Sequence, residues 1–339
     1  MPDRAGGGVA IRYWRRGKYE ARQLAITVNG KKFHTPAYLP SISSIFARIT
    51  PGPLIDAVAQ IGYPSLLVSA YDVYHASDRD RLLGLLNDYR RKGLLFLDSG
   101  GFEAHWRRDG SWGFDQYEEM VNTVPADMYA SFDKVGDAAI SINSADLSRG
   151  LRPEAACVSI CHGDSPQKLV ESAYEIAKRY QGSHPFIAVP DKECGTTLTE
   201  KISTIHRLKE KLVDTDALSC LHVMGCGSPI AAALFSFAGA DIFDSSDWYR
   251  RVIDAQTMRH LDYDHLELIG CECTACTTFQ GEDARVIGHN INFYKSYFDS
   301  LRSNIQIRGG LEFLTGKFDD RSIARLDELL KEGVAYGSG

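Results

Sequence analysis

The chain has 339 residues, of which 24% are charged and 44% are hydrophobic, the mix of an ordinary globular protein with one large or two ordinary domains. The formal net charge of −6 argues against a protein that coats nucleic acid uniformly, although 38 lysine and arginine residues leave room for a local basic face. No apolar run approaches the ~20 residues that a membrane-spanning helix needs, and residues 1–8 lack the apolar core of a signal peptide. We therefore expect a cytoplasmic protein with no membrane partner and with reduced cysteines.

Residues 1–18 are expected to be irregular, and the first recognisable element is a β-hairpin. Two apolar-rich runs, residues 22–28 and residues 31–35, are separated by Asn29-Gly30. Asn-Gly between such runs is a strong hairpin signal, because both residues tolerate the positive φ of a tight two-residue turn. We therefore predict an N-terminal β-hairpin.

Eight short apolar runs with strand character follow the hairpin. They cover residues 36–40, 65–69, 94–97, 127–132, 156–161, 185–189, 217–224 and 240–243. Longer segments of helical character separate them, such as residues 54–61, 116–123, 167–180, 196–212 and 229–238. Strands that alternate with helices form a parallel sheet, and eight such units predict a closed (β/α)8 TIM barrel of the α/β class. The alternative is an open doubly wound sheet, although no Gly-x-Gly-x-x-Gly follows the first strand.

Three cysteines crowd together after residue 260, where the alternating pattern ends. Cys271, Cys273 and Cys276 lie close in the chain, and His289 follows them. Three thiolates and one imidazole complete the tetrahedral shell of zinc, and a site with four protein ligands is structural rather than catalytic. The alternative is a loop with reduced cysteines. We predict one structural Zn2+ per chain, held in a C-terminal zinc-binding subdomain.

These elements predict the organisation of the whole chain. An irregular N-terminus covers residues 1–18, and the catalytic barrel with its N-terminal hairpin covers residues 19–260. The zinc-binding subdomain covers residues 261–302, and a C-terminal helix and tail cover residues 303–339.

Polar side chains follow the predicted strands at the edge where a barrel carries its active site. The run 94–97 ends at Asp98, and Asp133 and Asp244 follow two further strands. A single aspartate is ordinary, since Asp98 alone is equally well explained as the cap of the next helix. Three carboxylates at one mouth would repel one another, so their presence favours a functional cluster. The other side chains at these strand ends are Ser69, His162, Met224 and Gly225.

Such a cluster permits nucleophilic carboxylate catalysis with a second carboxylic acid as proton donor. In retaining cleavage of a glycosidic bond, one carboxylate attacks the anomeric carbon and the other protonates the leaving group. Lys134 and Lys192 also lie beside strand ends, but both follow acidic residues, so a Schiff-base lysine has less support.

Together the motifs resemble those of the tRNA-guanine transglycosylases, zinc-containing barrel enzymes that exchange a guanine for a 7-deazaguanine base without breaking the strand. The resemblance covers about residues 22–302 and includes the zinc-ligand cluster. Its other motifs are residues 34–40 (HTPAYLP), 98–102 (DSGGF), 131–133 (SFD), 223–227 (VMGCG), 239–244 (GADIFD) and 290–294 (NINFY). Each motif is weak alone, but their order along one chain is specific.

The resemblance implies a role for each matching residue. Asp244 would be the nucleophile that forms a covalent glycosyl intermediate, and Asp98 would be the general acid and base. Asp133 would accept hydrogen bonds from the donor edge of the purine. Phe102 and Met224 would stack on the two faces of that base.

The resemblance also implies a role for two glycines, and the chain departs from the family's pattern at three other positions. Gly101 and Gly225 would keep the pocket open to a flat ligand, and Ser69 takes the place of an asparagine that steadies the nucleophile. His162 replaces a glutamine that contacts the base, and would hydrogen-bond the base with a different donor and acceptor pattern. Pro185 lies where the family's backbone contacts the base, and proline offers no N–H group.

The resemblance implies a nucleic acid and a free 7-deazaguanine base as partners. Residues 245–251 replace the family's arginine-bearing loop, and the segment from Cys276 to His289 is shorter than in bacterial members, which leaves tRNA and DNA as alternative polymers. Only contacts to the 2′-hydroxyl would distinguish them. Candidate phosphate contacts are Arg12, Arg15, Arg16, Lys18, Arg107, Arg108, Arg250 and Arg251. Pairing near the zinc region in the family makes a homodimer a further expectation.

Two other function classes remain as alternatives. The family includes accessory subunits, so one alternative is a barrel that binds the base without catalysis, although Asp98 and Asp244 are both present. The other alternative is a base hydrolase or a small-nucleoside glycosylase with no polynucleotide partner.

Overall fold

Eight parallel strands form a closed barrel in the computed structural model, which describes residues 9–16, 20–183, 185–307, 309–316 and 318–337. They pair in the order β10-β11-β4-β5-β6-β7-β8-β9, and β9 pairs with β10 to close the ring. The strands are β4 (Ala37–Ile42), β5 (Ser65–Ser69), β6 (Leu94–Asp98), β7 (Met128–Ala130), β8 (Ala156–Ile160), β9 (Phe186–Pro190), β10 (Cys220–Met224) and β11 (Ile242–Ser245). The predicted barrel is confirmed, and each of the eight apolar runs supplies one of its strands.

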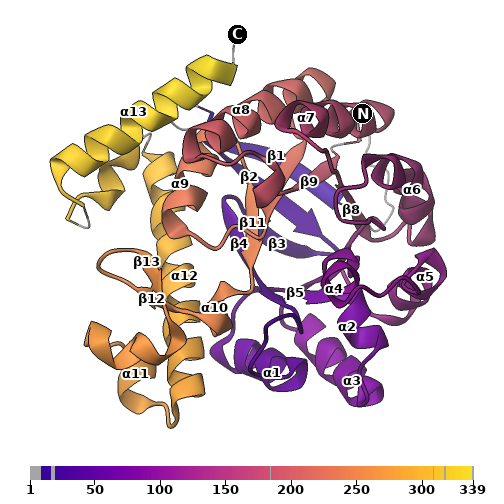
Figure 1. The fold of residues 1–339 in the computed structure, drawn as a ribbon, viewed down its shortest axis with the longest axis horizontal. Coiled ribbons are helices and arrows are strands. Elements are labelled where there is room, and N and C mark those ends of the chain that lie inside the picture. The colour runs from indigo at the N-terminus through magenta and orange to yellow at the C-terminus, as the bar shows by residue number, and fades with distance from the viewer. Residues whose placement is uncertain (1–8, 17–19, 184, 308, 317, 338–339) are drawn as a thin grey trace.

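Helices surround the strands and cover the outside of the barrel (Figure 1). They are α1 (Pro51–Ile61), α2 (Ala70–Tyr74), α3 (Arg79–Arg90), α4 (Gly101–Arg107), α5 (Phe114–Thr123), α6 (Ala138–Leu151), α7 (Pro166–Arg179), α8 (Leu198–Thr215), α9 (Pro229–Ala238) and α10 (Asp247–Arg250). Local capping signals start several of them. The Ser165 hydroxyl accepts the Lys168 backbone N–H at the start of α7, and Thr197 and Glu200 form a capping box on α8.

Strand β6 shows why the strand segments are apolar throughout. Leu95 and Leu97 pack with residues of the surrounding helices, whereas Leu94 and Phe96 pack in a separate cluster inside the barrel. A parallel strand that is covered on both faces needs an apolar side chain at every position. The apolar run therefore continues until the strand reaches the rim at Asp98.

The predicted hairpin covers the amino-terminal end of the barrel. Its strands β2 (Arg22–Val28) and β3 (Lys31–His34) pair antiparallel across Asn29-Gly30, where both residues have a positive φ. Leu24 packs into the cluster inside the barrel. The hairpin thus closes one end of the barrel and leaves the carboxyl ends of the strands at the other.

A third strand, β1 (Val9–Arg16), pairs antiparallel with β2. The outer edge of the hairpin leaves backbone donors and acceptors that another strand can pair, and Ile11 adds an apolar side chain to the interior cluster. The prediction of an irregular N-terminus is therefore wrong for residues 9–16. Residues 1–8 and 17–18 of that prediction lie outside the described residues.

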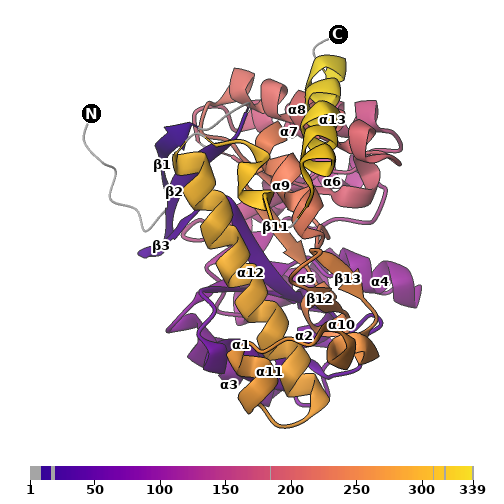
Figure 2. The same ribbon diagram turned by 90° about the vertical axis from the view of Figure 1, so that its left-hand side faces the viewer.

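The chain after β11 packs along one side of the barrel. Its elements are β12 (Val252–Asp254), β13 (Arg259–Leu261), the 3-10 helix η2 (Tyr263–Ile269), α11 (Thr274–Thr278), α12 (Glu282–Gln306), the 3-10 helix η3 (Leu311–Leu314) and α13 (Asp320–Gly337). Figure 2 shows α12 running from α11 to the strands β1 and β2. Tyr294 of α12 stacks on Tyr38 of β4, with 3.9 Å between ring centroids. Among the described residues, no helix is long and apolar enough to cross a membrane.

Two ion pairs with buried aspartates fix the hairpin to the barrel. Arg22 donates from Nε and Nη2 to the Asp241 carboxylate, both at 2.9 Å. Burial raises the pKa of Asp241, but the charges of Arg22 and Lys209 outweigh burial and lower it. On the other side of the barrel, Lys31 Nζ lies 2.6 Å from the Asp127 carboxylate. Both aspartates directly precede a barrel strand, so the pairs tie the hairpin to the amino-terminal rim.

We expect Arg22→Ala to lower the free energy of unfolding by about 3–5 kcal/mol, because it leaves the buried Asp241 carboxylate without its main partner. Urea denaturation followed by circular dichroism would measure the loss. The matched control is Arg81→Ala, since Arg81 pairs with Asp78 on the surface, and its loss should stay below about 1 kcal/mol. Equal losses in the two variants would contradict the prediction.

Candidate active site

The carboxyl ends of the strands surround a cavity of about 300 Å³, a size that suits one small ligand. Of the nine residues predicted for catalysis and base binding, eight line it: Ser69, Asp98, Phe102, Asp133, His162, Met224, Gly225 and Asp244. The remaining one, Gly101, packs directly against Asp133. A Cβ at Gly101 would lie 2.7 Å from Asp133 Oδ1, so only glycine allows α4 to approach this carboxylate so closely.

Asp98, at the end of β6, is buried among other carboxyl groups. The residue is 8% exposed, and its Oδ1 has no hydrogen-bond partner among the described residues. Burial, together with the neighbouring Glu103, Asp133 and Asp244, raises the pKa of Asp98 well above its usual range. The protonated form is therefore favoured, and Asp98 can act as a proton donor into the cavity.

Asp244, in β11, is held by two partners. Nε2 of His222 lies 2.8 Å from Oδ1, and the backbone N–H of Gly225 donates to the same oxygen at 3.3 Å. His222 is buried in the adjacent strand β10, and the sequence spacing did not single it out. One signal was available, because His222 lies two residues before Met224 and so faces the same side of the strand.

His162 joins two carboxylates at the cavity wall. Its Nε2 lies 2.7 Å from Asp133 Oδ2, and its Nδ1 lies 2.8 Å from Glu193 Oε1. Burial lowers the pKa of His162, but the hydrogen bonds to Asp133 and Glu193 outweigh burial and raise the pKa to about 9. The ring is therefore an imidazolium at neutral pH. Both ring nitrogens are engaged, so in this structure His162 has no free nitrogen for the expected direct hydrogen bond to a base.

Asp133 also accepts a hydrogen bond from the Ser99 hydroxyl. The backbone N–H of Gly163 donates to Glu193 Oε2 at 3.0 Å, which holds the second carboxylate against His162. Glu193 lies in the short 3-10 helix η1 (Asp191–Glu193) after β9. Sequence reasoning missed it, since nothing in its local pattern distinguishes it from a surface glutamate.

Glu103 is a second buried carboxyl that the sequence pattern did not single out. The hydroxyls of Ser43 and Ser69 donate to its two oxygens, the latter at 2.7 Å. Burial and the nearby Asp72 raise the pKa of Glu103 to about 7. Ser69 therefore bonds Glu103, whereas the resemblance implied that it would steady Asp244.

Two aromatic residues of the segment 245–251 are packed inside the protein. Trp248 Nε1 donates to the Ser41 carbonyl at 2.9 Å, and the Tyr249 hydroxyl donates to the Ser43 carbonyl at 2.7 Å. Both aromatic side chains are fully buried. These two side chains therefore anchor the segment against the end of β4, whereas the cavity is lined by four other residues of the segment: Ser245, Ser246, Asp247 and Arg250.

The candidate phosphate contacts lie in different parts of the structure. Arg250 lines the cavity, and Arg107 lies close by, where it donates to Ser44 Oγ at 2.8 Å. Arg108 and Arg251 are exposed. Arg12 lies on β1, in the sheet that covers the opposite end of the barrel. The side chains of Arg15, Arg16 and Lys18 lie outside the described residues.

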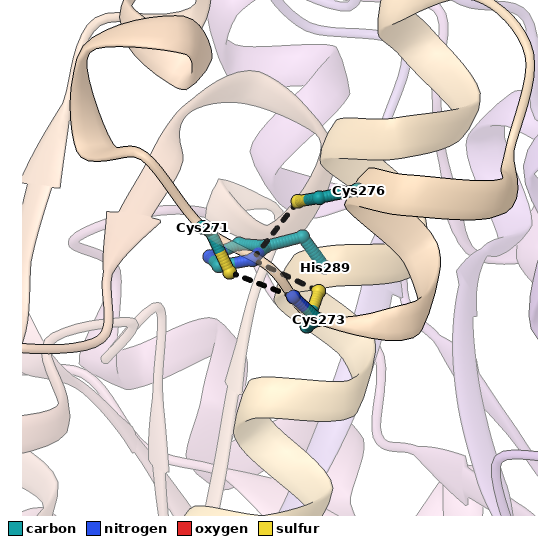
Figure 3. A group of neighbouring side chains, drawn as sticks. All are labelled: Cys271, Cys273, Cys276 and His289. Carbon is teal, nitrogen blue, oxygen red and sulfur yellow. Dashed lines mark hydrogen bonds between the residues drawn. The ribbon is translucent and has the colours of Figure 1, made fainter.

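The cysteine and histidine cluster forms a compact group between α11 and α12 (Figure 3). The four ligand atoms of Cys271, Cys273, Cys276 and His289 lie within 4.8 Å of one another. His289 Nδ1 is 3.5 Å from Cys273 Sγ and 3.6 Å from Cys276 Sγ. A tetrahedral zinc with bonds of about 2.0 Å to nitrogen and about 2.3 Å to sulfur places these atoms about 3.5 Å apart. The predicted ligands therefore come together in a group that fits one structural zinc ion.

The surroundings of His289 also fit a metal ligand. Its Nε2 donates to the Ile253 carbonyl at 2.7 Å, which leaves the lone pair of Nδ1 directed toward the three sulfurs. The next residue, Asn290, accepts the Ile253 N–H at 3.0 Å and donates to the carbonyls of Trp248 and Arg251. The zinc cluster and the chain that follows Asp244 are thus held by consecutive residues of α12.

Two sequence comparisons with known proteins gave different results. No protein-family model matches it. It is similar to the tRNA-guanine(15) transglycosylases of Thermococcus onnurineus (23% identical over 285 residues), Methanopyrus kandleri (24% over 282 residues) and Thermococcus kodakarensis (23% over 283 residues). The chain is related to the tRNA-guanine transglycosylases. This confirms the resemblance that the sequence motifs predicted.

The relationship covers only part of those proteins. Each match spans 77% of this chain, but 47%, 59% and 47% of the three relatives, so the chain spans about half the length of the curated relatives it matches. In the described part of this chain, the barrel, the cavity at its rim and the zinc-ligand cluster lie together.

We expect about one zinc per chain in purified protein, because the four ligands are preassembled. Cys276→Ser should lose most of that metal and lower the melting temperature. Mass spectrometry of metals and thermal melts would measure both effects. Cys226→Ser is the control, since Cys226 is a buried cysteine outside the cluster, and it should keep its zinc. A folded wild type without metal would contradict the assignment.

The stability that His162 contributes should depend on pH. Its pKa of about 9 in the folded protein exceeds the ordinary value of 6.5, so the contribution is fully present below pH 6.5 and is lost as the pH rises through about 9. The melting temperature of wild type should exceed that of His162→Gln most at pH 6–7, and the gap should shrink by pH 10. A gap that stayed constant over this range would contradict the imidazolium assignment.

Proposed function

We propose that this protein is a guanine transglycosylase that exchanges a guanine in a nucleic acid for a 7-deazaguanine base through a covalent aspartyl-glycosyl intermediate. The observation that carries the proposal is the contrast between two carboxyl groups of one cavity. Asp98 is buried with an unpartnered oxygen and a raised pKa, whereas Asp244 is held in place by His222 and Gly225. A proton donor and a positioned nucleophile are the pair that retaining cleavage of a glycosidic bond requires.

In the first half-reaction, a carboxylate oxygen of Asp244 attacks C1′ of the target nucleotide as the bond from C1′ to the guanine nitrogen breaks. Asp98 gives its proton to the departing guanine, which leaves as a neutral base. In the second half-reaction, Asp98 accepts the proton from the ring nitrogen of the incoming base. That nitrogen then attacks C1′ and releases the Asp244 carboxylate, so the strand is never cut.

Recognition of the base falls to Asp133 and to the apolar walls of the cavity. A carboxylate can accept two hydrogen bonds from the N1–H and exocyclic amino group of guanine. The imidazolium of His162 would act on the base through Asp133, by fixing that carboxylate in orientation. Phe102 and Met224 line the same cavity and would sandwich the flat ring.

The proposed function leaves two candidates for the nucleic acid substrate, tRNA and DNA. The names of the relatives state tRNA as their substrate, which supports tRNA as the first candidate. DNA is the second candidate, because the attack at C1′ does not need a 2′-hydroxyl. In either polymer the target base must leave its stack to enter a cavity of this size.

We expect wild-type protein to incorporate radiolabelled guanine or a 7-deazaguanine into tRNA or DNA, tested side by side. Asp244→Asn should abolish exchange, and Asp98→Asn should slow it by about 10²–10⁴-fold, the usual range for loss of a general acid. Asp88→Asn, an exposed carboxylate on α3, is the control and should exchange at the wild-type rate.

Full exchange by Asp244→Asn would overturn the nucleophile assignment. Release of free guanine without incorporation would instead favour a base hydrolase. Absence of exchange on both polymers, combined with tight binding of free base, would favour a non-catalytic accessory subunit.

A further inference from the structure

Three exposed aromatic side chains form a continuous strip at the mouth of the cavity. Phe46, Trp106 and Phe102 are 62%, 51% and 38% exposed. The Phe46 and Trp106 rings meet edge-on with centroids 5.5 Å apart, and Trp106 meets Phe102 in the same manner at 6.2 Å. We call these three residues the aromatic strip.

The aromatic strip is next to the cavity at both of its ends. At one end, Phe102 is itself a lining residue. At the other end, the guanidinium of Arg250, which also lines the cavity, lies 5.3 Å from the centroid of the Phe46 ring. A ligand that enters the cavity therefore has the strip beside it.

The structure holds Phe46 outward at a conformational cost. Its φ of 55° is in the left-handed region, which a bulky side chain rarely adopts. The neighbouring Ser44 anchors the loop, because its N–H donates to the Asp72 carboxylate at 2.6 Å and its hydroxyl bonds Asp72 and Arg107. An apolar ring that is fixed in solvent in a strained conformation indicates a surface used for contact.

The cations beside the strip suit an anionic polymer. In the described part of the chain, Arg250 donates to Ser246 Oγ at 3.2 Å and Arg107 donates to Ser44 Oγ at 2.8 Å, so each guanidinium is positioned by a hydroxyl instead of being neutralised in an ion pair. The charge of Arg107 also acts on the Asp72 carboxylate, whose two oxygens accept hydrogen bonds from the N–H and hydroxyl of Ser44. Aromatic rings interleaved with positioned cations are typical of surfaces that bind unpaired nucleotides.

We propose that the aromatic strip, and Trp106 above all, stacks on the unpaired nucleobase adjacent to the target nucleotide while Arg250 and Arg107 contact the flanking phosphates. The proposal rests on the proposed function, in which the target base turns into the cavity. A base that leaves its stack exposes a face of its neighbour, and the half-exposed indole of Trp106 replaces that lost stacking partner.

The test is equilibrium binding of a short fluorescent single-stranded oligonucleotide with one guanine, made as RNA and as DNA. A second version carries abasic sites on both sides of the guanine. We expect Trp106→Ala to weaken binding of the intact strand by about 5- to 100-fold, the range for loss of one base–aromatic stack. The abasic strand should bind wild type more weakly than the intact strand does, by a similar factor. Trp106→Ala should weaken binding of the abasic strand by less than about twofold, because the substitution and the abasic sites remove the same contact between indole and base.

Leu147→Ala is the matched control, because Leu147 is also 62% exposed but lies on α6 outside the cavity lining, and it should bind like wild type. Trp106→Phe should recover most of the affinity, and thermal melts should show that all variants are folded.

Wild-type affinity in Trp106→Ala, or equal losses on intact and abasic strands, would overturn the stacking proposal. So would a shift from dimer to monomer in Trp106→Ala with unchanged oligonucleotide binding, which would assign the strip to a second copy of the chain. Oligonucleotide binding does not require turnover, so the binding test and the base-exchange assay give separate results. If Trp106→Ala binds the oligonucleotide like wild type, the stacking proposal is rejected. If wild type exchanges no base, the proposed function is rejected.

Discussion

Closure of the barrel is the constraint on which the candidate site depends. The pairing of β9 with β10 completes a ring of eight parallel strands, so the carboxyl ends of all of them meet at one rim. The hairpin covers the other end, and apolar side chains fill the interior. Asp98, Asp133 and Asp244 lie far apart in the sequence and become neighbours only because the ring closes. Polar chemistry is thereby confined to the rim.

Gathering carboxyl groups at one rim costs electrostatic energy, and the structure offsets this cost differently for each group. Asp98 favours its protonated form, Asp133 faces the imidazolium of His162, and Asp244 accepts a backbone N–H and contacts His222. These different environments also suit the carboxyl groups to the different roles proposed for them. A carboxyl that keeps its proton suits a general acid, whereas one fixed by neighbouring donors suits a nucleophile.

The zinc-ligand cluster lies outside the cavity, yet α12 connects it to the strand of Asp244, the proposed nucleophile. Metal binding would clamp the segment 271–276 to α12 through His289, and Asn290 of the same helix bonds the backbone that follows β11. Tyr294 then stacks α12 on β4, the strand that pairs with β11. A structural metal can in this way hold the strand of Asp244 in register while taking no part in the chemistry.

The sequence was enough to predict the barrel, the hairpin and the zinc ligands, because apolar periodicity, the Asn-Gly turn and ligand spacing are local properties of the chain. It also placed the carboxylates at the strand ends. Only the tertiary structure revealed β1, since an edge strand depends on the edge that it joins. The same holds for the site residues missed by sequence reasoning: Glu103, Glu193 and His222. The hydrogen-bond partners of Ser69 and His162 were also visible only in the fold. These hydrogen bonds, and the pKa shifts that follow from them, arise between groups that are distant in sequence and meet only when the chain folds.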